Sequence, residues 1–159
     1  MKKFRIYLDT SVIGGCFDPE FLEASNKLME MIRLGIFTGV VSNVTVEELQ
    51  GAPEHVRDLL KNYSDDEVIR LSATDEVLAL TKSYLDAKVV TSRFEGDAAH
   101  VAYATIHHAD MIVSWNFRHL VNFQRIHAFN AVNMQLGYGL IDIRTPKEVI
   151  YGREEEKGF

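Results

Sequence analysis

The chain has few of the residues that mark secreted and membrane proteins. Among 159 residues there is a single cysteine, Cys16, which excludes an internal disulfide. Nothing near Cys16 in the sequence completes a metal site, so we expect a packed or incidental thiol in a reducing cytoplasm. No apolar run approaches the length of a membrane span, and the start MKKFRIYLDT lacks the apolar segment and small-residue cleavage site of a signal peptide. We therefore expect a cytoplasmic protein with no membrane association.

Positive charge is also scarce. Lysine and arginine number 17 against 23 aspartates and glutamates, which gives a net charge of -6. This balance excludes a protein that coats nucleic acid by charge alone. It does not exclude an enzyme that cuts nucleic acid, because divalent cations in an acidic pocket present positive charge locally. The glycine pair Gly14 and Gly15 lacks the spacing of a dinucleotide or nucleoside triphosphate loop, so we expect no such cofactor.

The sequence alternates strand-like and helix-like segments. Strands separated by helices predict a parallel sheet covered on both faces. We therefore expect an α/β fold, a three-layer α/β/α sandwich with a mostly parallel sheet of four to five strands. Residues 1–150 would form one domain, and residues 151–159 a loosely held tail, because their mixed charges have no apolar periodicity. The predicted strands are 4–8, 37–42, 66–72, 110–116 and 140–145; the predicted helices are 18–35, 43–63 with an interruption, 75–88, 96–109, 116–122 and 129–139, with a final turn from Pro146.

Acidic residues stand where several of these elements end or begin. Asp9 ends the first strand, Glu47 and Glu48 follow the second, and Asp97 opens the alanine-rich helix. Asn116 follows the buried strand MIVS. Because the carboxyl ends of parallel strands meet at one edge of a sheet, we expect these side chains to converge. Clustered carboxylate oxygens suit Mg²⁺ or Mn²⁺, and three such groups without a cation would repel one another.

Metal-assisted phosphodiester hydrolysis is the chemistry that such a site supports. Each residue also has a simpler explanation. Asp9 could form an Asx-turn, and glutamates on a helix are commonly solvated. Asp97 could cap its helix, and Asn116 could cap the segment that follows it. The metal site is favoured by the combination of three acids and an amide, each at the functional end of its element.

Neighbouring polar residues are accessory candidates. Thr10 and Ser11 could position the Asp9 carboxylate or bond a metal-bound water, or they could be plain turn hydroxyls. His100 lies three residues after Asp97 on the same helical face, where it could steady a phosphate or a metal-bound water, or simply pack against its neighbours. The candidates for contact with a phosphate backbone, each of which could equally be a surface residue, are Arg93, Arg118, His119 and Asn122.

The segments that carry these residues resemble PIN-domain nucleases, the fold of VapC-type toxins in toxin–antitoxin pairs. YLDTSVIGG resembles the opening strand of the family with its aspartate, and VSNVTVEELQG resembles the second motif, in which a hydroxyl residue precedes an acid followed by leucine. GDAAHVAYATIHHADMIVSWNF resembles the stretch with the third acid and the fourth metal-site position, and IRTPKEVI resembles the closing segment. The resemblance runs from residue 4 to about residue 149.

The resemblance implies that Asp9, Glu48 and Asp97 are metal ligands. It favours Glu48 over Glu47, because the acid of the family directly precedes the leucine; successive helical residues point about 100° apart, so only one of the two glutamates can face the site. Asn116 stands where many members have aspartate. An amide brings an oxygen but no charge, so a second metal would be held more weakly.

The resemblance further implies a Mg²⁺- or Mn²⁺-dependent endoribonuclease that cleaves RNA, the toxin of a type II toxin–antitoxin pair with a small antitoxin as partner. Homodimerisation is also implied, in keeping with surplus apolar residues Leu28, Met29 and Met31 on an early amphipathic helix. The alternative, favoured by Asn116, is a catalytically impaired PIN module that binds RNA or protein without cleavage. A phosphotransfer domain ranks lower, because an aspartate-nucleophile phosphatase needs a second acid where Ser11 stands.

Overall fold

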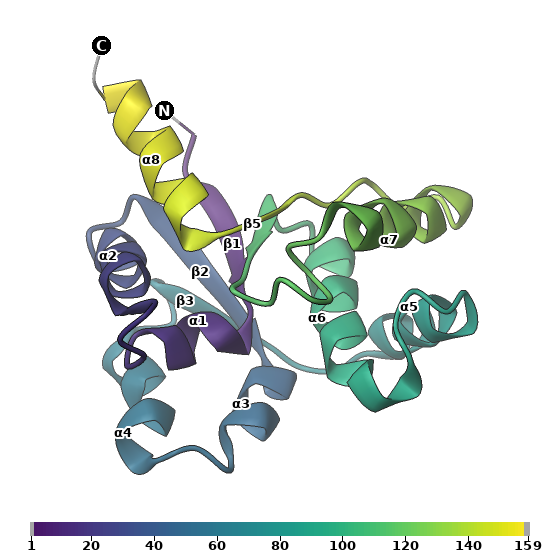
Figure 1. Ribbon diagram of the computed structural model, residues 1–159, viewed down its shortest axis with the longest axis horizontal. Coiled ribbons are helices and arrows are strands. Elements are labelled where there is room, and N and C mark those ends of the chain that lie inside the picture. Colours follow the sequence, from purple (N-terminus) through teal and green to yellow (C-terminus); the bar gives the residue numbers. More distant parts are fainter. Residues whose placement is uncertain (1, 158–159) are drawn as a thin grey trace.

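The computed structural model describes residues 2–157, with side chains as far as residue 153. All neighbouring strands of its five-stranded sheet are parallel, which confirms the predicted α/β fold with a mostly parallel sheet (Figure 1). The strands lie in the order β3-β2-β1-β4-β5. Their bounds are β1 Phe4–Leu8, β2 Phe37–Ser42, β3 Val68–Leu71, β4 Met111–Val113 and β5 Ile143–Arg144.

Helices cover both faces of the sheet. One face packs against α1, α2 and α8, and the other packs against α5, α6 and α7 (Figure 1). Within the described residues, no helix combines the length and the apolar character needed to cross a membrane. The helices are α1 Thr10–Gly15, α2 Leu22–Arg33, α3 Asn43–Leu49, α4 Glu54–Arg57, α5 Asp75–Asp86, α6 Glu95–Ile106, α7 Phe123–Gln135 and α8 Pro146–Lys157, with 3₁₀ turns η1 Leu59–Asn62 and η2 Ser92–Phe94.

The central strands are apolar on both sides because each side faces its own core. In β1, Ile6 and Leu8 belong to the core beside α1, α2 and α8, whereas Tyr7 belongs to the core on the opposite face. In β4, Val113 and Ile112 divide between the two cores in the same way. All five side chains are completely buried. Strands buried on both faces give the continuous apolar runs by which the sequence predicted them.

The structure differs from prediction after β4. The predicted short helix over 116–122 is a turn, in which the Asn116 carbonyl oxygen accepts from the backbone amides of Leu120 (3.1 Å) and Val121 (2.8 Å). The following helix, α7, begins at Phe123 instead of residue 129. Its start is fixed by Asn122, whose side chain accepts from the Arg125 amide (3.2 Å) and so caps the first turn.

The chain end also departs from prediction. Helix α8 continues through Lys157, so the segment from residue 151, which we expected to be loosely held, is helical as far as it is described. Arg153 holds this segment to the sheet. Its side chain is buried, donates to the Lys2 carbonyl oxygen (2.9 Å) and lies over the rings of Phe4 and Phe37. The last two residues of the predicted tail, 158–159, lie outside the described residues.

The three apolar residues that suggested a dimer surface on the early helix are buried. Leu28, Met29 and Met31 of α2 all lie in the core and are at most 6% exposed. The interpretation of these residues as surplus apolar surface is therefore wrong. Cys16 is also buried in this core, as expected of a packed thiol, and burial raises the pKa of its thiol to about 11.

Candidate active site

Asp9 lies at the point where the strand order turns back. Strand β1 is flanked by β2 on one side and by β4 on the other, and such a switch leaves a crevice at the carboxyl ends of the strands. Asp9 directly follows β1, and its backbone amide donates to the Val113 carbonyl oxygen of β4 (3.0 Å). The residue is only 4% exposed. The fold thus places a carboxylate at the site that open α/β sheets use for ligands.

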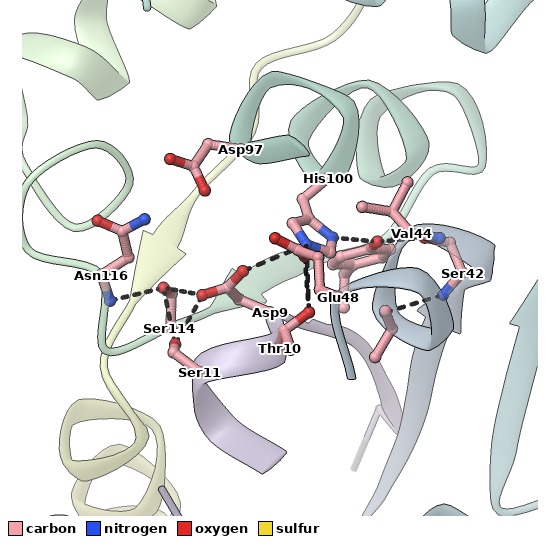
Figure 2. A network of polar contacts seen from close by, with 12 residues as sticks. Asp9, Thr10, Ser11, Ser42, Val44, Glu48, Asp97, His100, Ser114 and Asn116 are labelled. Atoms are coloured by element: carbon pink, nitrogen blue, oxygen red, sulfur yellow. Dashed lines mark hydrogen bonds and ion pairs between the residues drawn. The ribbon is translucent and has the colours of Figure 1, made fainter. Parts of the chain in front are cut away.

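The Asp9 carboxylate is held by two hydroxyl groups. Its Oδ2 accepts from Ser11 Oγ (2.6 Å) and from Ser114 Oγ (2.8 Å), and its side chain makes no capping hydrogen bond to α1 (Figure 2). The simple explanation of Asp9 as a turn residue is therefore not realised. Because both hydroxyls bind Oδ2, the other oxygen is turned toward His100, with Oδ1 3.4 Å from Nε2.

Helix α3 places Glu48, and not Glu47, beside Asp9. Glu48 Oε1 accepts from Thr10 Oγ1 (2.8 Å) and contacts His100 Nε2. Glu47 is exposed and lies within 3.5 Å of Asn43 Nδ2. Burial raises the pKa of Glu48. The hydrogen bonds from His100 and Thr10 and the charge of His100 together lower it by more, so the net pKa is below its ordinary value. Glu48 is therefore ionised at neutral pH.

A glycine lets α6 approach Glu48. A Cβ atom at Gly96 would lie 3.2 Å from Glu48 Oε2, which is closer than ordinary van der Waals contact. The absent side chain therefore leaves room for the carboxylate beside the first turn of the helix. Gly96 is the first residue of the helix predicted over 96–109, but its role beside Glu48 depends on the distance between two helices.

His100 is completely buried and connects the site to the sheet. Its Nε2 contacts Glu48 (Figure 2). Its Nδ1 lies 2.6 Å from the Tyr7 hydroxyl, which in turn lies 2.7 Å from Ser42 Oγ. Burial lowers the pKa of the imidazole, but Glu48 and Asp9 raise it more, and the net pKa is above its ordinary value. A protonated His100 donates from both ring nitrogens, to Glu48 and to Tyr7. His100 is thus a packed residue and also part of the acidic site.

These side chains are close enough to surround one cation. Ligand atoms of Asp9, Glu48 and His100 all lie within 4.8 Å of one another, and they form the only group of this kind among the residues that the structure describes. Ligands about 2.1 Å from Mg²⁺ lie about 3 to 4 Å apart, so small side-chain shifts bring this group to the required spacing. The two carboxylates fit a hard divalent cation, whereas a protonated His100 supplies a counter-charge and no ligand.

Asp97 extends from the first turn of α6 toward the site (Figure 2), although it is not part of the group formed by Asp9, Glu48 and His100. It does not cap the helix, which begins after Phe94; instead its Oδ2 lies 2.8 Å from His119 Nδ1. Burial raises the pKa of Asp97, the hydrogen bond with His119 lowers it, and the nearby charge of Asp9 raises it again; the net pKa is above its ordinary value. A cation nearby would relieve this cost.

Asn116 stands at the edge of the site after β4. Its side-chain Oδ1 accepts from the His119 backbone amide (3.0 Å), and its own backbone amide donates to Ser114 Oγ (2.9 Å). The amide group therefore stabilises the turn that follows, as the simpler explanation of Asn116 expected. The side-chain Oδ1 of Asn116 keeps a second lone pair that is available to bind a cation.

His119 lies inside the protein, so the simpler explanation of it as a surface residue is wrong. Its side chain is buried, bonds Asp97 and packs on the Phe94 ring with the ring centres 4.2 Å apart. Arg118 is exposed, with its guanidinium over the same ring, 5.2 Å from the centroid. His119 therefore positions an acid, whereas Arg118 faces solvent.

Sequence analysis missed Ser114 and Tyr7. Ser114 reaches Asp9 because β4 pairs with β1 in the register Leu8 to Val113, which sets the following residues side by side. Tyr7 reaches His100 because it points to the face of the sheet that α6 covers. The alternation along β1 could have given the face of Tyr7. The partner of Ser114 depends on strand pairing, which the sequence does not give.

Residues 5–118 match the family model of the PIN domain. The chain belongs to the PIN domain family. A chain in the crystal structure of VapBC2 from Rickettsia felis bound to a DNA fragment from their promoter is 13% identical, with a TM-score of 0.56 over 89% of this PIN domain protein and 98% of that chain. A chain in the crystal structure of FitAcB from Neisseria gonorrhoeae is 16% identical, with a TM-score of 0.55 over 89% and 97%. At these identities the likeness establishes a shared fold. No curated protein matches the sequence.

Proposed function

We propose that this PIN domain is a divalent-metal-dependent endoribonuclease that hydrolyses phosphodiester bonds in RNA. The observation that carries the proposal is the meeting of Asp9 and Glu48, which lie far apart in the sequence, at the carboxyl edge of the sheet with His100 between them. Membership of the PIN domain family supports the same chemistry. The acidic group also lies at a topological switch point, where open α/β sheets bind their ligands.

Asp9, Glu48 and Asp97 would hold Mg²⁺ or Mn²⁺, with Asn116 as a neutral fourth group. When bound, such a cation makes water a better nucleophile at neutral pH and stabilises charge on phosphate oxygens. The chain itself orients the ligands. Ser11 and Ser114 fix one oxygen of Asp9, Thr10 holds Glu48, and His119 holds Asp97. Hydrogen bonds of this kind, made to the ligands, commonly set metal affinity.

The proposed biological role is that of a toxin restrained by a small antitoxin, in the cytoplasm and as a homodimer. The motifs that resemble VapC-type toxins support this role, as does the fold shared with a chain of VapBC2.

Cleavage of single-stranded RNA in Mg²⁺ or Mn²⁺ tests the enzyme. We expect D9N to lower the cleavage rate by at least about 100-fold, because Asn keeps the size and the hydrogen bonds but removes the charge that binds the cation. The matched control is D66N, because Asp66 is exposed and its side chain has no partner within the described part of the chain. Equal rates for wild type and D9N would contradict the proposal.

A second candidate is a PIN module that binds RNA or protein without cleaving it. The observation that favours it is the neutral amide at the fourth position, where Asn116 Oδ1 already accepts from the His119 amide. RNA binding by the wild-type protein with no cleavage in either metal would select this alternative.

A further inference from the structure

The Asp97 side of the site carries two arginines without an acidic partner. Arg93 of η2 and Arg118, after β4, are exposed and make no ion pair among the described residues. Exposed Lys3, Arg57, Lys88 and Lys147 also make no ion pair among the described residues, whereas other exposed cations are neutralised within the chain. Those with a carboxylate partner are Lys2, Arg33, Lys61, Arg70, Lys82 and Arg144.

One aromatic ring gathers both guanidinium groups. Arg93 lies 5.5 Å and Arg118 5.2 Å from the centroid of Phe94. Arginine over an aromatic ring gains a modest attraction at an exposed site, and it keeps its planar donor groups available for an anion. Two residues from separate segments of the chain are thereby held at one place. An arrangement that fixes flexible side chains before binding reduces the entropy lost when a ligand binds.

The same ring leads directly to the acidic site. Phe94 packs on His119, with ring centres 4.2 Å apart, and His119 Nδ1 lies 2.8 Å from Asp97 Oδ2. The arginines therefore lie on the Asp97 side of the site, linked to that carboxylate through Phe94 and His119. An anion bound by them would lie next to the group that the acidic site acts on.

We propose that Arg93 and Arg118, held by Phe94, bind backbone phosphates of the RNA strand beside the scissile bond, on the Asp97 side of the site. This inference rests on the proposed function and adds the direction in which the strand runs from the site. Arginine binds phosphate with two parallel donors, which lysine cannot do. A single strand is the substrate favoured, because positively charged side chains that track one backbone are typical of single-strand binding.

The test compares the double variant R93Q/R118Q with R57Q. Arg57 of α4 is also exposed, with no ion pair in the described part of the chain, and α4 lies on the other side of α3 from α6 (Figure 1). We expect the double variant to raise KM for a single-stranded RNA about tenfold or more and to leave kcat within about twofold, the pattern of lost ground-state binding. R57Q should match wild type. R118K should fall between wild type and R118Q, because it keeps the charge and loses the paired donors.

Binding of the same RNA to D9N, with and without R93Q/R118Q, gives a readout independent of cleavage. Loss of two phosphate contacts should lower the slope of log affinity against log salt by about 1.4, at about 0.7 per contact. If R93Q/R118Q cleaves RNA with the KM and salt slope of the unsubstituted arginines, the phosphate contact is overturned and the nuclease proposal stands. The same conclusion holds if the arginines prove to bind acidic groups of a partner protein. Binding without cleavage would overturn the nuclease alone. Neither binding nor cleavage would overturn both.

Discussion

Ser114 donates a hydrogen bond to Asp9 Oδ2 over 2.8 Å, although 105 positions separate the two residues in the chain. With Ser11 on the same oxygen, it leaves Oδ1 of Asp9 turned toward Glu48 and His100. The orientation of the central carboxylate is therefore set by a residue of the neighbouring strand. This contact is the first target for mutation.

S114A should weaken Mn²⁺ binding about tenfold, because hydrogen bonds that orient a ligand typically change metal affinity by about 10- to 100-fold. Calorimetric titration of the purified protein with Mn²⁺ measures the effect. The control is S83A, because Ser83 is half-buried on α5, away from the site, and bonds only its own helix, at the Ala79 carbonyl oxygen. If S114A and S83A bind Mn²⁺ equally well, the hydroxyl of Ser114 does not orient Asp9 for a cation.

N116D should tighten binding of divalent cations by up to about tenfold, because it adds a charge to the acidic group and ligand charge raises cation affinity. The turn should persist, since a carboxylate also accepts from the His119 amide that Asn116 binds now. The number and affinity of Mn²⁺ ions bound are measured by titration, with N62D as an exposed control. A weaker affinity in N116D than in wild type would show that position 116 does not face the cation.

G15A should destabilise the fold by about 1 to 3 kcal/mol, the usual cost of overpacking a core. A Cβ at Gly15 would lie 2.6 Å from Ser25 Oγ and 2.9 Å from Trp115 Nε1, two atoms that bond each other. G14A is a matched control on the same helix: a Cβ there meets nothing within 4 Å, so alanine should be neutral or stabilise by about 0.5 to 1 kcal/mol. Urea unfolding of both variants measures the difference, and equal stability would contradict the packing at Gly15.

D110N should lower the free energy of unfolding by about 1 kcal/mol at pH 7. Burial raises the pKa of Asp110, but hydrogen bonds from Lys2 Nζ and the Arg5 amide, both 2.8 Å, lower it more, and the net pKa is below its ordinary value of 3.8. A depressed pKa means that this stability is present above pH 3.8 and is lost as pH falls through the pKa of the folded state.

Urea unfolding of wild type and D110N between pH 7 and pH 2.5 should therefore show two curves that converge at the acid end. D66N, at an exposed aspartate, controls for the change in net charge. A difference that stays constant down to pH 2.5 would show that the carboxylate charge of Asp110 is not its source.

The sequence predicted the strands better than the segments between them. β1 was predicted at its observed bounds, because strands buried on both faces give apolar runs that no other element gives at that length. The turn over 116–122 and the start of α7 were predicted wrongly, because they depend on the single side chains of Asn116 and Asn122, whose hydrogen bonds override apolar spacing.

By itself, the sequence determined the α/β class, the positions of Asp9, Glu48, Asp97 and Asn116 at the ends of their elements, and the family. Only the tertiary structure decided what these groups touch. The pairing of β1 with β4 brought Ser114 to Asp9, and the approach of α6 to α3 brought His100 between two carboxylates. The physical reason is that periodicity is local and survives in any packing, whereas hydrogen-bond partners far apart in the chain depend on strand order and helix spacing.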